Sequence, residues 1–120
     1  MEEKDVTPTE IFDTLAIRFR EAKALEHKID SNLHFTLTDQ TKGDYLYTVK
    51  VQNGKLEVQT GHHDKPTCTV RTKAQTYVDV NLGKTKPQMA IMLGKIKVSN
   101  LPEMFLFAQL FEKFTLDYVK

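Results

Sequence analysis

The segment from Pro87 to Phe114 is the longest apolar part of the chain, and its hydrophobic period changes twice. Pro87–Leu93 has helical spacing and begins with a proline, whose missing N–H costs nothing in a first turn. Gly94 stands where glycine commonly ends a helix. Lys95–Asn100 then alternates apolar and polar residues, which is typical of a half-buried strand. Leu101–Phe114 returns to helical spacing and is apolar on nearly every side.

A helix that is apolar on nearly every side must be covered on nearly every side. The cover is the protein's own core, a partner chain or a lipid-like ligand. The pattern of this segment leaves the three alternatives open.

The N-terminal part of the chain predicts one helix followed by a change of period. Thr7-Pro8-Thr9-Glu10 has the form of a capping box, with Thr7 as the N-cap and Glu10 three residues later. An amphipathic helix of about four turns is expected over Thr7–Leu25, since apolar residues recur on one side of it. From Asn32 onward the period is two, which indicates strands.

Three strands in antiparallel order are predicted next. Asn53-Gly54 is a strong signal for a two-residue hairpin turn, because both residue types tolerate positive φ. A fourth short strand and another helix follow. The five segments are Asn32–Thr38, Tyr45–Val51, Lys55–Thr60, Thr67–Arg71 and the helical Thr72–Gly83.

This order of elements predicts an α+β domain: a five-stranded mixed sheet covered on one face by helices. The last strand is reached through two helices, so it is expected to pair parallel to a neighbour. A length of 120 residues indicates a single domain over residues 1–120, with residues 1–6 as a loose tail.

Composition and charge narrow the function classes. The net charge of +1 argues against nucleic acid as a partner and allows at most transient membrane contact. Cys68 is the only cysteine, which excludes an internal disulfide and fits a reducing compartment. The first residues are acidic and polar, unlike a signal peptide, and no apolar run has the length of a membrane span. A cytoplasmic protein is the expectation.

Candidate catalytic chemistry is sparse, and the sequence predicts a protein that is not an enzyme and uses no cofactor. His62-His63-Asp64 is the one cluster with metal-capable side chains, but no further ligand stands at a suitable spacing, so no metal site is expected. Cys68 lies mid-strand and is expected to point inward, as an inert thiol does.

Methionines give a more informative signal. Met89, Met92 and Met104 fall within one apolar stretch, and methionine suits adaptable binding surfaces as well as cores. The predicted helices offer more apolar surface than one sheet requires. The surplus indicates a ligand cavity or a dimer interface, and the protein is expected to be a monomer or a homodimer.

The run from His63 to Phe114, HDKPTCTVRTKAQTYVDVNLGKTKPQMAIMLGKIKVSNLPEMFLFAQLFEKF, resembles the sterol carrier protein type 2 domain. The matching features are a strand, a helix with Tyr77, a Pro-led helix, the Gly-Lys-Ile-Lys-Val run that begins at Gly94, and an apolar last helix. The hairpin signal and the strands before it agree with the same family, so the resemblance covers nearly the whole chain.

The resemblance implies a hydrophobic tunnel between the sheet and the helices that binds fatty acids, fatty acyl-CoA or sterols without chemical change. Some members are appended domains that support dimerisation or present substrate. Two departures stand out: Ser99-Asn100 replaces a glycine after the last strand, and Leu93 replaces a glutamine before Gly94. A less polar site favours alkyl chains over a sterol hydroxyl.

The predicted function is therefore non-enzymatic binding and transfer of a long-chain lipid. The alternative is a structural or dimerisation module with a collapsed cavity. The residues predicted to line the ligand site all belong to the inward face of their segments: Phe35, Tyr77, Met89, Met92, Ile96, Met104, Phe105 and Ala108.

Overall fold

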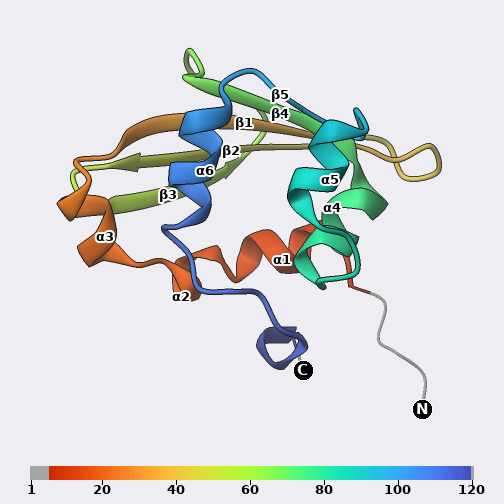
Figure 1. Ribbon diagram of the computed structural model, residues 1–120, viewed down its shortest axis with the longest axis horizontal. Helices are drawn as coiled ribbons and strands as arrows, with labels where there is room; N and C mark the ends of the chain where they lie inside the picture. The colour runs from red at the N-terminus through yellow and green to blue at the C-terminus, as the bar shows by residue number, and fades with distance from the viewer. Residues whose placement is uncertain (1–5, 120) are drawn as a thin grey trace.

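Five strands form one mixed sheet in the computed structural model, which describes residues 6–119 (Figure 1). The strands lie in the order β3-β2-β1-β4-β5. Only β1 and β4 are parallel among the pairs that the described residues make. The strand bounds are β1 Asp30–Thr38, β2 Tyr45–Gln52, β3 Lys55–Thr60, β4 Cys68–Lys73 and β5 Ile96–Val98. The predicted α+β class and the mixed sheet of five strands are confirmed.

Helices gather on one side of this sheet (Figure 1). Their bounds are α1 Pro8–Asp13, α2 Leu15–Arg18, α3 Glu21–Glu26, α4 Ala74–Asn81, α5 Pro87–Met92, α6 Leu101–Ala108 and the 3₁₀ helix η1 Leu116–Val119. The predicted loose tail falls outside the described residues, apart from Val6.

Local turn and capping chemistry was predicted correctly. The Thr7 hydroxyl accepts a hydrogen bond from the Glu10 N–H, and the Glu10 carboxylate accepts one from the Thr7 N–H, so the capping box is complete. Asn53 and Gly54 have φ of 54° and 75° and join β2 to β3. Both features depend on residues close together in the chain, which is why the pattern predicts them.

The prediction of one long N-terminal helix over Thr7–Leu25 is wrong. The segment is divided into α1, α2 and α3, with breaks at Thr14 and at Phe19, whose backbone is extended. Phe19 forms an antiparallel bridge with Phe111, and the Arg20 N–H donates to the Leu110 carbonyl oxygen at 2.6 Å. Pairing with a distant segment supplies the backbone hydrogen bonds that a continuous helix would have supplied.

The last helix is also shorter than predicted, because α6 ends at Ala108 and not at Phe114. The chain after it takes part in the pairing with the N-terminal segment, where the Glu112 N–H donates to the Arg18 carbonyl oxygen at 2.8 Å. Phe111 and Phe114 therefore pack against the domain from outside any helix.

The expected parallel pairing of the last strand is wrong as well. Strand β5 runs antiparallel to β4 at the sheet edge, with Ile96 opposite Thr72 and Val98 opposite Val70. Helices α4 and α5 lead the chain away from the end of β4 and return it to that same end, so β5 must run back. The crossover is made instead by residues 61–67, which join edge strand β3 to β4.

An aromatic stack holds the helices to the inner face of the sheet. Phe12 of α1 stacks on Tyr47 of β2 at 4.0 Å between ring centroids and on Tyr77 of α4 at 5.1 Å. It also meets Phe35 of β1 edge to face at 5.3 Å. Such pairs add to the stabilisation from burial alone. This cluster joins strands and helices into one core, and two of its members, Phe35 and Tyr77, also line the candidate site.

Candidate functional site

An apolar pocket of about 340 Å³ lies between the inner face of the sheet and helices α4, α5 and α6. Strands contribute Phe35, Val70, Ile96 and Val98 to its wall. The α6 residues in the wall are Met104, Phe105, Phe107 and Ala108, and the C-terminal segment adds Phe111 and Phe114. A concave site with a largely aromatic and aliphatic wall is the usual form of a pocket for an apolar ligand.

Six of the eight residues predicted for the ligand site line this wall: Phe35, Tyr77, Ile96, Met104, Phe105 and Ala108. Phe105 and Ala108 are nonetheless exposed, Phe105 at 42%, so the prediction that they face the core is wrong. They reach it from four different elements, β1, α4, β5 and α6. Contact of these residues with a ligand stays a prediction.

Met89 and Met92 lie elsewhere, and their predicted inward orientation is wrong. They are 49% and 78% exposed and do not line the pocket. Helix α5 turns Ala90 and Ile91 inward, and positions three or four apart share a helix face. Met89 and Met92 therefore lie together with Leu93 on the outer face. The apolar surplus of α5 is an exposed stripe and not a cavity lining.

Arg18 is the functional candidate that the sequence pattern missed. It ends α2, only 5% of it is exposed, and it lines the apolar pocket. Its Nε donates to the Thr14 hydroxyl at 3.0 Å, and its Nη1 donates to the Glu112 carbonyl oxygen at 3.1 Å. Its guanidinium lies 5.4 Å from the centre of the Phe114 ring. Nothing in the local sequence marks an arginine on an amphipathic helix as buried.

The charge of Arg18 is not neutralised within the part of the chain that the structure describes. Its partners there are a hydroxyl, carbonyl oxygens and an aromatic ring, and it forms no ion pair among residues 6–119. Burial lowers the pKa of the Arg18 guanidinium from its ordinary value. Arginine nonetheless keeps its proton in proteins, so the pocket wall contains a cation.

Tyr77 gives the pocket a second polar group with unusual titration. Burial raises the pKa of its phenol well above the ordinary value, and the nearby Arg18 opposes this only in part. The phenol therefore stays protonated at neutral pH. It offers hydrogen bonding and no negative charge, so Tyr77 cannot balance the charge of Arg18.

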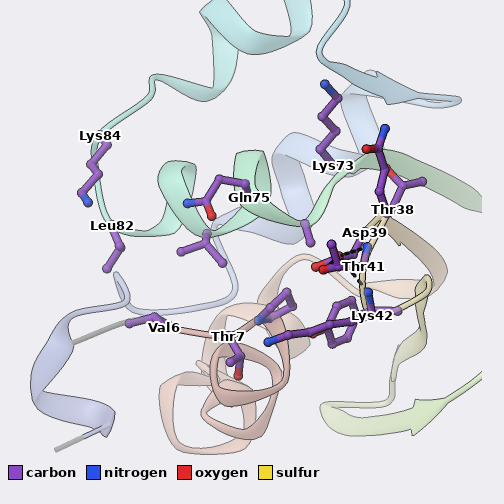
Figure 2. A pocket seen from close by; sticks show the side chains of 15 residues that line it. Val6, Thr7, Thr38, Asp39, Thr41, Lys42, Lys73, Gln75, Leu82 and Lys84 are labelled. Carbon is purple, nitrogen blue, oxygen red and sulfur yellow. Dashed lines mark hydrogen bonds between the residues drawn. The ribbon is translucent and has the colours of Figure 1, made fainter. Parts of the chain in front are cut away.

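A second, larger pocket of about 630 Å³ runs along the length of α4, from Lys73 to Lys84, and has a different character (Figure 2). Figure 2 shows Lys84 at one end of it and Lys42 and Lys73 at the other. The Asp39 carboxylate there accepts hydrogen bonds from the N–H groups of Thr41 and Lys42, which hold the pKa of that carboxyl below its ordinary value. Its wall mixes ammonium, hydroxyl and amide groups with apolar residues such as Val78 and Leu82, so it suits a hydrocarbon chain less well than the apolar pocket does.

Candidate groups for catalysis are few in the described part of the chain. Burial raises the pKa of the Cys68 thiol, which opposes formation of a thiolate nucleophile. His62 lies over the outer face of the sheet, where its ring stacks on His34 at 4.6 Å between centroids. Residues 6–119 contain no group of three or more side chains placed to hold a metal ion.

The longest helices within residues 6–119 have eight residues, and none is long and apolar enough to cross a membrane.

Comparison with known families gives one match over nearly the whole chain. The model of the family described as alkyl sulfatase C-terminal matches residues 3–118. Among solved structures, the stereoselective inverting sec-alkylsulfatase of Pseudomonas sp. is similar at 27% identity with a TM-score of 0.75. The match covers 92% of this chain and 17% of that one, so this chain spans about a sixth of the alkylsulfatase.

Sterol carrier proteins are similar over most of their own length. The sterol carrier protein domain 2 of Helicoverpa armigera has a TM-score of 0.64 at 24% identity, with 90% of this chain and 91% of that one covered. The palmitated sterol carrier protein 2 like 2 of Aedes aegypti has a TM-score of 0.68 at 15% identity, with 92% and 100% covered. The resemblance to the sterol carrier protein 2 domain is confirmed, and identities this low show the fold alone.

Proposed function

The chain belongs to the alkyl sulfatase C-terminal family, and from that premise we propose that it binds the hydrocarbon chain of a long-chain amphiphile in the apolar pocket. Its fold is that of the sterol carrier protein 2 domains, a lipid-binding family. The observation that supports the proposal most directly is the pocket of about 340 Å³ between the sheet and α4–α6.

Removal of methylene groups from water supplies the driving force. Each buried CH₂ contributes about 0.8 kcal/mol, so a long alkyl chain has ample driving force before ordering costs are subtracted. The ligand classes are those predicted from the sequence: a fatty acid, a fatty acyl-CoA or a sterol-like molecule. Binding is proposed to involve no covalent change, and release to an acceptor constitutes transfer. The proposal includes a tunnel that continues from this pocket.

An enzymatic setting is also compatible with the family. Since the chain matches a sixth of an alkylsulfatase, the pocket is proposed there to hold the alkyl chain of a substrate while another part of the enzyme performs the chemistry.

We propose a monomer or homodimer in the cytoplasm with at most transient membrane contact, which fits the net charge of +1.

A structural or dimerisation module is the second candidate, and one observation favours it. Met89, Met92 and Leu93 form an exposed apolar stripe along the outer face of α5. A second copy that packs against this stripe would remove it from water. This function does not require an occupied pocket.

One experiment separates the two candidates. A fluorescent fatty acid is titrated against the protein, and the mass of the protein in solution is measured in parallel. Saturable one-to-one binding by a monomer is expected for the carrier, while a stable dimer that binds nothing would support the module.

Two arginine substitutions make the titration specific to the pocket. Met104→Arg places a long, strongly hydrated side chain among the residues proposed to contact the hydrocarbon chain and is expected to abolish binding, while Met92→Arg on the exposed face of α5 is the matched control and should bind normally. Unchanged affinity in Met104→Arg would remove Met104 from the ligand site.

A further inference from the structure

We propose that the pocket of about 630 Å³ along α4 binds the phosphoryl groups of a phosphorylated organic molecule of the size of a nucleotide. We call it the lysine pocket, because Lys42, Lys73 and Lys84 belong to its wall. This site is separate from the apolar pocket, and the inference does not depend on the proposed function.

The topology of the sheet brings two of the lysines to one crevice. Strands β1 and β4 are parallel neighbours, so both end on the same side of the sheet, with Thr38 opposite Lys73. The chain then returns through β2 after β1, but enters α4 after β4. A crevice opens where such connections diverge, and ligands of open sheets commonly bind there. Lys42 lies in the turn after β1 and Lys73 ends β4, so both reach this crevice (Figure 2).

The charge of the pocket is strongly positive for a protein whose net charge is +1. Its wall contains three lysines and one acid, Asp39, so two positive charges are in excess. The Asp39 carboxylate accepts hydrogen bonds within its own turn, from the N–H and hydroxyl of Thr41 and from the Lys42 N–H. Lys42 and Lys73 form no ion pair within residues 6–119. Their ammonium groups, with three donors each, are available to a phosphoryl group.

The apolar part of the wall indicates an organic ligand and not an inorganic one. Pro8, Ala74 and Val78 are buried, and Leu82 is half-buried beside them. Tyr45 belongs to the same wall. Inorganic phosphate or pyrophosphate would contact the lysines and leave this apolar surface in water. A ligand that carries an organic ring system would cover it and gain affinity from its burial.

The first turn of α4 adds to the attraction for an anion. The N-cap is Lys73, and no side chain caps the N–H groups of this turn. Such groups carry partial positive charge. Ala74 and Gln75 of this turn belong to the pocket wall. The helix start strengthens a site that the cavity and its lysines already define.

Helix α4 separates the two pockets. Ala74, Val78 and Leu82, four residues apart in turn, line the lysine pocket. Tyr77 and Asn81 line the apolar pocket. Loss of a lysine charge should therefore leave the uptake of an apolar dye unchanged, so each site has a readout of its own.

Lysines that serve only solubility make a different prediction. Exposed lysines attract every anion weakly, and salt screens this attraction. The effect would be the same for any exposed lysine of the chain. A binding site depends on which lysine is changed and on the organic part of the ligand.

The first experiment titrates ADP, pyrophosphate and adenosine into the unaltered protein by calorimetry, at a salt concentration of about 0.15 M that screens diffuse attraction. ADP is expected to bind about tenfold more tightly than adenosine, because charged hydrogen bonds form only with its phosphoryl groups. It should also bind more tightly than pyrophosphate. Equal affinity for ADP and adenosine would overturn the inference, and pyrophosphate that binds as tightly as ADP would overturn the assignment to an organic ligand.

A lipid head group can supply the same phosphoryl chemistry, and sedimentation with vesicles distinguishes the two sources. Phosphatidylcholine vesicles with added phosphatidic acid are not expected to carry down more protein than plain ones. If they do, and Lys73→Gln abolishes the difference while ADP does not bind, phosphoryl recognition stands and its source is a lipid. Binding of neither ADP nor these vesicles would refute the inference.

The second experiment removes single charges. Lys42→Gln and Lys73→Gln are each expected to weaken ADP binding by about fivefold. Lys73→Arg keeps the cation and should retain most of the affinity. Lys55→Gln is the matched control, because it removes the same charge from an exposed side chain outside the pocket wall. Equal weakening in Lys55→Gln would assign the effect to net charge and contradict the proposed site.

Nile red, a neutral dye, reports on the apolar pocket in the same proteins, and circular dichroism checks that each variant folds. If Lys73→Gln does not fold, Lys42→Gln in the exposed turn provides the test. Unchanged ADP affinity in the folded variants would refute the role of these lysines. Normal dye uptake without phosphoryl binding would overturn this inference alone, while ADP binding without dye uptake would count against the proposed function alone.

Discussion

Val98 on β5 offers a direct way to shorten the apolar pocket. Its side chain stands in the pocket wall beside Val70, its partner across the β4–β5 pair. Val98→Phe adds roughly four carbon atoms to a cavity of about 340 Å³, which displaces about three methylene groups of a bound chain. At about 0.8 kcal/mol for each methylene, the loss is about 2.4 kcal/mol, or roughly fiftyfold in Kd.

The assay compares alkanols of different length by displacement of Nile red. Hexanol is short enough to fit the shortened pocket and should bind as before, whereas decanol should be weakened. Neutral ligands are used so that the length of the alkyl chain is the only property that varies.

Lys97→Phe is the matched control, because neighbouring residues of a strand point to opposite faces of the sheet. Lys97 is exposed and lies outside the pocket wall, so the same ring introduced there should change neither affinity. If Val98→Phe weakens hexanol and decanol equally, the effect is a general disturbance and the reasoning about length fails. Unchanged decanol affinity in a stably folded Val98→Phe would show that the ligand does not reach this wall.

Three further predictions concern the stability of the fold. Phe12→Ala should lower the free energy of unfolding by about 3–5 kcal/mol, since Phe12 is buried among three aromatic rings. Ile17→Ala, at an exposed site, should lower it by less than about 0.5 kcal/mol. Urea titration measures both values, and equal losses would contradict the assignment of Phe12 to the core. Thr7→Ala removes the capping box with Glu10 and should cost about 1 kcal/mol in the same titration; no loss would show that the cap does not stabilise α1. Because burial raises the pKa of Tyr77, its phenol ionises at a lower pH in the unfolded chain than in the folded one. The free energy of unfolding should therefore fall as the pH rises above about 10, and the fall should be smaller in Tyr77→Phe. Equal falls in both proteins would exclude Tyr77 as the source.

Sequence pattern was sufficient for the features that neighbouring residues decide. The capping box at Thr7, the Asn53-Gly54 hairpin turn and the alternation in β1–β3 each depend on residues within a few positions of one another. The class of fold followed from the order of these elements. Most of the inward positions of the candidate site followed as well, since alternation in β5 and helical spacing in α6 place Ile96 and Met104 on the buried side.

Features that depend on distant segments were not predictable from the pattern. The N-terminal helix breaks at Phe19 because Phe111, far away in the chain, pairs with it. Helix α5 is short and apolar on two faces, and only its packing against β5 shows that Ala90 faces inward and Met92 does not. Periodicity identifies an apolar face but does not say which of two such faces meets the core.

The sequence by itself determined the class of the fold, most of its strands and turns, and an excess of apolar side chains, because each depends on local backbone preference and on the period of burial. Only the tertiary structure decided how the excess is divided between a pocket and the exposed stripe on α5. The same holds for Arg18, whose environment is set by a hydrogen bond to a residue 94 positions later in the chain. A buried charge is created by packing, and no pattern of neighbouring residues encodes it.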